Sequence, residues 1–224
     1  MKLYKLNQRQ LLNAKQYYQD ICSDLFPVTK RILDIVISLI TLILLSPLLI
    51  ILGLLIKQES NGPALFKQQR VGLYGKTFTM FKFRSMSQDA QAQRNKLERH
   101  NEMSSGVLFK IKNDPRITPL GKIIRKTSID ELPQLINVLR GEMSLVGPRP
   151  ALPNEVSQYS FNDRTRLNVL PGITCLWQVM GRSEIPFEQQ VKLDLKYIKK
   201  QSLLFDVSLL LKTIPAVIKA KGAY

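Results

Sequence analysis

One long apolar stretch constrains this chain more than any other feature. The residues from Ile32 to Ile56 read ILDIVISLITLILLSPLLIILGLLI, with Asp34 as the single charged side chain. A helix of about 25 residues is long enough to cross a bilayer core with some tilt. A polar stretch precedes the run and no small-residue cleavage site follows it, so it is not a signal peptide. The sequence therefore predicts a membrane-embedded helix.

The flanks and the midpoint of this stretch favour a re-entrant hairpin over a straight span. Lys30 and Arg31 lie at one end and Lys57 at the other, whereas Lys and Arg normally gather on the cytoplasmic side. Pro47 kinks the helix because it lacks a backbone donor, and Ser46 can satisfy groups that the kink frees. A hairpin leaves both ends cytoplasmic. An ordinary transmembrane helix with a tolerated proline is the alternative.

Asp34 is unusual inside an apolar run. Lys30 precedes it by four residues and Arg31 by three, so all three side chains share one face of a helix. We expect an ion pair at the membrane interface that makes the carboxylate tolerable there. In the simpler alternative, Asp34 lies at head-group depth.

The rest of the chain is strongly basic. Its 224 residues include 33 Lys or Arg and 17 Asp or Glu, which gives a net charge of +16. Such a chain attracts nucleic acid, anionic lipid or phosphorylated substrates. His100 is the only histidine, and Cys22 and Cys175 lie far apart, which disfavours histidine-dependent nucleophiles and zinc sites. Acid-base or nucleophilic chemistry therefore falls to carboxylates, Lys, Tyr or Ser.

Residues 64–86 have the pattern of a β hairpin. Two β-prone runs flank a loop that contains Gly72 and Gly75. Lys82 and Arg84 are two residues apart on the second strand, so they point to the same side. That side is either a binding surface or a solvated face.

Helices are expected in three other places. Residues 1–29 are polar with scattered leucines, which suggests a short amphipathic helix on the membrane surface. A short basic helix is expected within 113–128. Two more are expected between 191 and 220, the second of them broken by Pro215 and suited to the membrane interface or, alternatively, to the core.

The segment TSIDELPQLINVLRGE places Asp130 and Glu131 side by side. Locally the pair is explained by helix capping. Ser128 with Glu131 three residues later is a capping box, and acids in a first turn complement the helix dipole. Gly141 closes the predicted helix. This interpretation leaves open whether the two carboxylates also carry chemistry.

The segment MSLVGPRP displays an arginine on a stiff backbone. Pro148 and Pro150 bracket Arg149 and restrict its conformation to extended geometry. The planar guanidinium suits bidentate phosphate binding. The following VLPGITCLWQVMGRS contributes turn residues and the only tryptophan, Trp177.

Together these motifs resemble the bacterial sugar transferases, the monotopic polyprenyl-phosphate hexose-1-phosphate transferases. The matching segments are KRILD, the membrane SP pair, GPALFKQQRVGLYGKTFTMFKFRSM, FKIKNDPRITPLGKIIRKTSIDELPQLINVLRGEMSLVGPRP, PGITCLWQVMGR and the terminal GAY. The resemblance covers residues 28–224. It indicates the small form, without the N-terminal multi-helix membrane region of larger members.

The resemblance implies an α-rich α+β monotopic membrane protein with a re-entrant helix hairpin broken at Ser46 and Pro47, a small β hairpin and interfacial amphipathic helices. It implies three regions: a polar N-terminal segment (1–29), the membrane helix (30–57) and a cytoplasmic catalytic domain (58–224). The expected location is the cytoplasmic face of the bacterial inner membrane, in contact with membrane lipids.

The resemblance also implies an activity. A hexose-1-phosphate moves from a UDP-sugar to undecaprenyl phosphate, UMP is released, and Mg²⁺ is required. Asp130 would act as the nucleophile and Glu131 would help to hold the metal. Basic residues are expected to bind the phosphates, with Lys82, Arg84, Arg125 and Arg149 as candidates. The product would begin a capsule, exopolysaccharide or O-antigen repeat. Glucose and galactose are the leading sugars, with an N-acetylated amino sugar as a further alternative.

Two positions depart from the family pattern. Cys175 and Met180 stand where the family commonly has glycine and serine, near the expected nucleotide or sugar pocket. They therefore bear on the identity of the sugar and not on the reaction. A homodimer is compatible with the sequence, and no nucleic-acid partner is expected. The alternatives are a basic membrane-tethered module that binds nucleic acid or lipid, and a different lipid-linked transferase with a true membrane span.

Overall fold

The computed structural model describes residues 8–97, 111 and 113–219. Its α-helices are α1 (Gln8–Glu59), α2 (Ala90–Leu97), α3 (Pro119–Lys126), α4 (Gln134–Leu139), α5 (Pro153–Val156), α6 (Leu176–Met180), α7 (Phe187–Lys200) and α8 (Leu203–Lys219). Its strands are β1 (Leu65–Val71), β2 (Thr77–Phe83), β3 (Ser144–Val146) and β4 (Gly172–Thr174). Short 3₁₀ turns connect several of them, including Ile129–Glu131.

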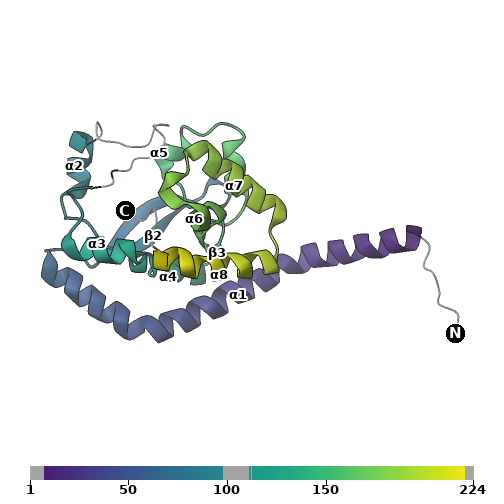
Figure 1. Ribbon diagram of the computed structural model, residues 1–224, viewed down its shortest axis with the longest axis horizontal. Coiled ribbons are helices and arrows are strands. Elements are labelled where there is room, and N and C mark those ends of the chain that lie inside the picture. Colours follow the sequence, from purple (N-terminus) through teal and green to yellow (C-terminus); the bar gives the residue numbers. More distant parts are fainter. Residues whose placement is uncertain (1–7, 98–110, 112, 220–224) are drawn as a thin grey trace.

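The apolar stretch lies within one long, bent helix. Helix α1 has 52 residues with Pro27 and Pro47 inside it, and its C-terminal arm turns back towards the rest of the chain (Figure 1). The hydroxyl of Ser46 donates to the carbonyl of Ile43 (2.8 Å), which confirms its expected partnership near the proline. The predicted boundary at residue 29 does not interrupt the helix. The amphipathic helix expected over residues 1–29 falls partly outside the described residues.

Both flanks of the apolar stretch are tied to the same globular body. The guanidinium of Arg31 donates to the carbonyl of Val138 (2.6 Å) before the stretch. After the stretch, the carbonyl of Ile56 accepts from the guanidinium of Arg84 (3.0 Å). The bend of α1 brings both attachments to one side of the helix (Figure 1). Both ends of the apolar stretch are therefore attached to the same body of the protein.

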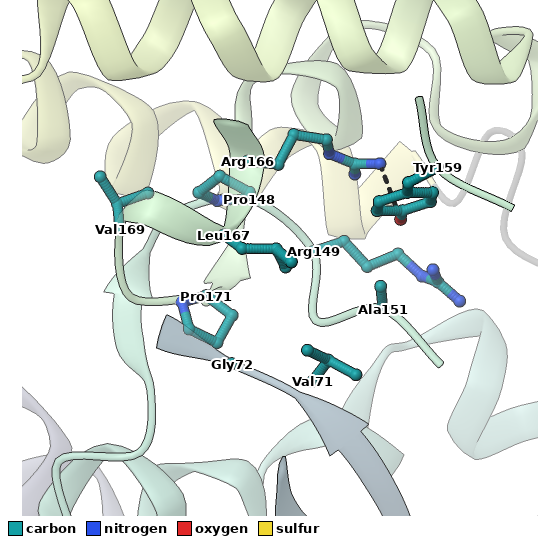
Figure 2. Close-up of a pocket in the computed structure, with 10 residues that line it drawn as sticks. All are labelled: Val71, Gly72, Pro148, Arg149, Ala151, Tyr159, Arg166, Leu167, Val169 and Pro171. Carbon is teal, nitrogen blue, oxygen red and sulfur yellow. Dashed lines mark hydrogen bonds between the residues drawn. The ribbon is translucent and has the colours of Figure 1, made fainter. Parts of the chain in front are cut away.

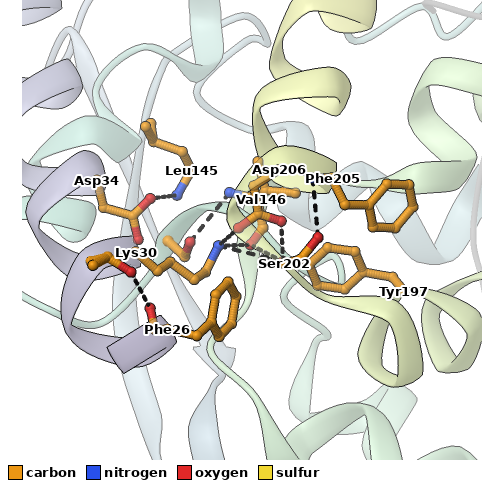
Figure 3. A network of polar contacts seen from close by, with 11 residues as sticks. Phe26, Lys30, Asp34, Leu145, Val146, Tyr197, Ser202, Phe205 and Asp206 are labelled. Carbon is orange, nitrogen blue, oxygen red and sulfur yellow. Dashed lines mark hydrogen bonds and ion pairs between the residues drawn. The ribbon is translucent and has the colours of Figure 1, made fainter. Parts of the chain in front are cut away.

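The expected ion pair of Asp34 with a neighbouring cation is wrong. The carboxylate of Asp34 is buried and accepts from the backbone amide of Leu145 (3.1 Å). Lys30 instead forms an ion pair with Asp206 of α8 and donates to the carbonyl of Val146 (3.1 Å), as Figure 3 shows. Lys30 and Asp34 do not pair with each other because each meets a buried group from another part of the fold. A buried carboxylate such as that of Asp206 is costly without a partner. The alternative, that Asp34 lies at head-group depth, stays a prediction; within the protein its side chain is buried.

The outer surface of α1 remains apolar. Leu25–Glu59 is long and apolar enough to cross a membrane, by length and composition. Helix α8 is likewise two-sided: Leu209 is fully buried, while Leu204 and Ile218 are 84% and 77% exposed. Pro215 lies inside α8, so the expected break is wrong, and the helix continues to Lys219. The exposed apolar side chains agree with the predicted interfacial helix.

The predicted β hairpin is confirmed. Strands β1 and β2 pair antiparallel from Leu65 opposite Phe83 to Val71 opposite Thr77. The short basic helix is also confirmed as α3, and two helices, α7 and α8, occupy the C-terminal region. A second, parallel pair, β3 with β4, was not expected, because three-residue strands carry no readable periodicity. A buried core joins β2, α4, β3, α6, α7 and α8.

Two glycines allow the parallel pair to form. A Cβ built on Gly172 would lie 2.0 Å from the amide nitrogen of Gly147, and one built on Gly147 would lie 2.4 Å from the carbonyl oxygen of Leu170. The amide of Gly172 donates to the carbonyl of Pro148 (2.9 Å). This close approach fixes the backbone immediately before Arg149.

We expect Gly172→Ala to lower the free energy of unfolding by about 2–3 kcal/mol, because backbone rather than a flexible side chain must move. Thermal unfolding of the detergent-solubilised protein measures this effect. Gly75→Ala is the matched control: its φ of 80° is strained, but no atom lies within 4 Å of the added Cβ. A smaller loss for Gly172→Ala than for Gly75→Ala contradicts the prediction.

Candidate active site

A cavity of about 530 Å³ lies where the hairpin, the 3₁₀ turn, β4, α6 and α8 meet. Among the residues that the structure describes, its lining contains two acids, Asp130 and Glu131, and five cations: Arg70, Lys82, Arg125, Arg149 and Arg182. The excess of positive charge suits an anionic ligand. The volume falls in the usual range for small-molecule sites.

The two adjacent carboxylates lie in a 3₁₀ turn and not at the start of an α-helix. Ser128 has a positive φ of 57° and its side chain makes no capping hydrogen bond, so the predicted capping box is wrong. Helix α4 begins only after Pro133. The left-handed Ser128 and the tight turn replace the cap and present both acids to the cavity. The predicted end of the helix is correct, because Gly141 has a φ of 77° and donates to the carbonyl of Val138 (2.9 Å).

The two carboxylates have different environments. The ammonium of Lys82 forms an ion pair with Glu131 (2.7 Å). Burial opposes ionisation of Glu131, but Lys82, Arg149 and Arg182 together outweigh it and lower the pKa of that carboxyl. Burial raises the pKa of Asp130 to about 6, with Lys82 opposing the rise and Glu131 adding to it. The carboxyl of Asp130 is therefore largely removed from water, and the ammonium of Lys82 is paired with the adjacent Glu131.

Arg149 lies on the cavity wall, held by a buried acid. Its guanidinium donates to Glu155 (3.0 and 3.4 Å), which also accepts from the amide of Leu152 (2.9 Å). Burial opposes the charge of Arg149, but Glu155 raises the pKa of the guanidinium overall. A cavity of about 10 Å³ behind this segment is too small for a substrate (Figure 2). It is a small packing gap beside the segment that carries Arg149.

Two cations on the cavity wall were missed by sequence reasoning, Arg70 and Arg182. Arg70 is buried on β1 and donates to the carbonyl of Pro150 (3.0 Å). Burial and the like charge of Arg149 lower the pKa of Arg70 to about 9, so it stays cationic at neutral pH. An arginine on a strand can be recognised as a site residue only when the inward-facing side of the strand is known. Strand pairing decides which side that is. Arg182 has a positive φ of 51°, which the sequence does not reveal.

The structure does not bring Arg84 to the cavity. Its guanidinium donates to the carbonyls of Ile56 (3.0 Å), Ser60 (2.6 Å) and Asn61 (2.7 Å). These carbonyls belong to the last turn of α1 and the residues after it, where helix carbonyls have no internal partner. Arg84 follows the last residue of β2, and its guanidinium anchors the end of α1, whereas Lys82 on β2 pairs with Glu131 at the cavity.

We expect Arg84→Met to lower the free energy of unfolding by about 2–4 kcal/mol, because three carbonyls near the end of α1 lose a charged donor. Thermal unfolding in detergent measures the loss. Arg84→Lys, which keeps the charge, is expected to recover part of the loss. A variant that unfolds like the wild type contradicts the anchoring role.

The remaining candidates divide between the cavity and other places. Arg125, from the last turn of α3, and Trp177, on α6, line the cavity. Cys175 is fully buried and Met180 is 63% exposed, and neither contributes to the lining. These two departures from the family pattern therefore lie near the cavity, as expected, because Thr174, Trp177 and Val179 line it, but they do not form its wall.

The carboxylates fit a magnesium ion that arrives with a substrate. Within the described part of the chain, no group of three or more His, Cys, Asp or Glu side chains could hold a metal ion by itself. Mg²⁺ is commonly held by one or two carboxylates together with water and substrate phosphates. Glu131, on the wall of the cavity, can supply such a carboxylate.

The chain thus combines a cavity that suits anionic ligands and contains two carboxylates with a long apolar helix of the length needed to cross a membrane. The comparison with known proteins gives the family. The chain belongs to the bacterial sugar transferases, whose family model matches residues 25–220.

Individual relatives agree with this assignment. The chain is 44% identical over 198 residues to the undecaprenyl-phosphate galactose phosphotransferase of Salmonella typhimurium, covering 87% of this chain and 41% of that protein. It is 40% identical over 209 residues to the UDP-glucose:undecaprenyl-phosphate glucose-1-phosphate transferase of Caulobacter vibrioides, covering 87% and 72%. It is 38% identical over 200 residues to the exopolysaccharide production protein ExoY of Sinorhizobium fredii, covering 88% of both. The chain thus spans about two fifths of the length of the first of these relatives and most of the third.

Proposed function

We propose that this protein transfers a hexose-1-phosphate from a UDP-sugar to undecaprenyl phosphate and releases UMP. The observation that carries the proposal is Asp130, buried on the wall of a cation-rich cavity while the adjacent Glu131 is paired with Lys82. Relatives named as undecaprenyl-phosphate galactose and glucose transferases support the same reaction. Family membership favours this enzyme over a nucleic-acid or lipid-binding module.

The reaction proceeds in two steps. A carboxylate oxygen of Asp130 attacks the phosphorus that bears the sugar, and the bond from that phosphorus to the oxygen of UMP breaks. UMP leaves, and Asp130 carries the hexose phosphate as an acyl phosphate. A phosphate oxygen of undecaprenyl phosphate then attacks the same phosphorus, and the carboxylate of Asp130 leaves. The two steps let a water-soluble donor and a membrane-bound acceptor use one site in turn.

The surrounding residues make attack by an anion on an anion feasible. Lys82 engages Glu131, so that Asp130 remains available to the phosphorus. Arg149, Arg70 and Arg125, which line the same cavity, bind phosphate oxygens and reduce the repulsion. Glu131, with Asp130 beside it, would hold Mg²⁺, which when bound neutralises phosphate charge.

The proposed location is the cytoplasmic face of the bacterial inner membrane, where UDP-sugars are available. The attachment of both flanks of α1 to one body supports a re-entrant helix with both ends cytoplasmic. The product would begin a polysaccharide repeat. A homodimer is compatible with this arrangement.

The test is UMP release by the purified protein across a panel of UDP-sugars, with Mg²⁺, in the presence and absence of undecaprenyl phosphate. We expect sustained release with the acceptor and about one equivalent of UMP per enzyme without it. UDP-galactose and UDP-glucose are the first donors to test. Absence of release with every donor would contradict the transferase, whereas release only with acceptor present would contradict the covalent step.

A further inference from the structure

One wall of the cavity is mainly apolar and is formed by α8. The C-terminal half of α8 contributes Leu210, Thr213, Ala216 and Val217 to the lining. Their spacing of three, three and one places them on one face of the helix. The opposite face exposes apolar side chains, with Leu211, Ile214 and Ile218 between 58% and 77% exposed. A single helix therefore separates the cavity from an apolar outer surface.

The α8 wall is apolar towards the cavity. The hydroxyl of Thr213 pairs with that of Thr174 (2.8 Å) and donates to the carbonyl of Leu209 (2.8 Å), so its polar atom is already engaged. Ile173 and Val179 extend the same lining from β4 and α6. The cations and carboxylates come from β1, β2, α3, the 3₁₀ turn of Asp130, the segment of Arg149 and the turn of Arg182 after α6, and none comes from α8. The cavity is thus polar on one side and hydrocarbon-like on the other.

A nucleoside diphosphate sugar has polar groups along its whole length, so it leaves this wall without a matching ligand. A lipid that ends in a single phosphate matches both sides, because its head group suits the cations and its chain suits the apolar lining. We propose that the inward face of α8, from Leu210 to Val217, holds the first isoprene units of the acceptor. The inference rests on the proposed function and assigns residues to its second substrate.

The proposal is tested by filling the wall. We expect Ala216→Trp to raise the KM for undecaprenyl phosphate about tenfold or more, because the indole occupies the space of the chain, while the KM for the UDP-sugar changes less than about twofold. Ile214→Trp is the matched control. It adds the same indole to the exposed face of the same helix, and both KM values should stay within about twofold of the wild type.

Val217→Asn is a second variant that adds no volume. It makes the wall polar, so we expect it to raise the KM for the acceptor alone. A rise in the donor KM in either cavity-facing variant, or an unchanged acceptor KM in both, overturns the assignment. Equal effects of Ala216→Trp and Ile214→Trp also overturn it, since they would reflect α8 as a whole. If the wild type itself transfers no sugar phosphate, the proposed function fails, which is a separate outcome.

Discussion

Asp130→Asn is expected to slow UMP release at least roughly a thousandfold, because the amide cannot form the acyl phosphate. The substitution keeps the size of the side chain and leaves the ion pair of Lys82 with Glu131 in place. It also removes a desolvated charge, since burial raises the pKa of Asp130 to about 6. The variant should therefore fold at least as well as the wild type. Activity is measured as UMP release with the best UDP-sugar, Mg²⁺ and undecaprenyl phosphate.

Two controls make the result decisive. Glu188→Gln removes a carboxylate from an exposed position on α7 and should leave the rate unchanged. Thermal unfolding of Asp130→Asn shows whether the protein remains folded. Release of UMP by a folded Asp130→Asn variant at the wild-type rate would mean that Asp130 is not the nucleophile.

Lys30→Met is expected to destabilise the fold by about 3–5 kcal/mol, because it leaves the fully buried Asp206 without its cation. For a chain of this size, that corresponds to a fall of roughly 10 °C in Tm. The effect concerns more than one contact, since Lys30 also donates to the carbonyl of Val146 and the hydroxyl of Tyr197 (Figure 3). Thermal unfolding in detergent, followed by the fluorescence of Trp177, measures the shift.

The double variant separates the ion pair from the packing around it. Combining Lys30→Met with Asp206→Leu removes both charges, and we expect it to recover most of the lost stability. A Lys30→Met protein that unfolds within a degree or two of the wild type contradicts the anchoring role. A double variant no more stable than Lys30→Met shows that packing, and not the unpaired carboxylate, accounts for the loss.

Local sequence was sufficient for elements with a strong repeating pattern. The apolar run predicted a long membrane-type helix, the glycines at 72 and 75 predicted the hairpin, and Gly141 predicted the end of α4. It was insufficient where two local signals allowed different geometries. Ser128 and Glu131 had the spacing of a capping box, but Lys82 on a distant strand engages Glu131, and the chain forms a 3₁₀ turn instead.

The predictions made alongside the family resemblance included most of the residues of the candidate site. Lys82, Arg125, Asp130, Glu131 and Arg149 all line one cavity, as expected for residues that act together. Arg84 was assigned to the same group, and its spacing of two residues from Lys82 predicted that both side chains point to the same side of a strand. The end of α1 lies beside it in the fold, and unpaired helix carbonyls attract its guanidinium.

The sequence by itself determined that this chain has one membrane-type helix, a basic body, a hairpin and an Asp-Glu pair, because each depends on the order of neighbouring residues. Only the tertiary structure decided which charges meet. Lys30 lies one helical turn from Asp34 yet pairs with Asp206, 176 positions away, and Arg70 reaches the carbonyl of Pro150 across the fold. The physical reason is burial: a carboxylate or carbonyl removed from water must find a donor, and the packing of distant elements decides which donor is near.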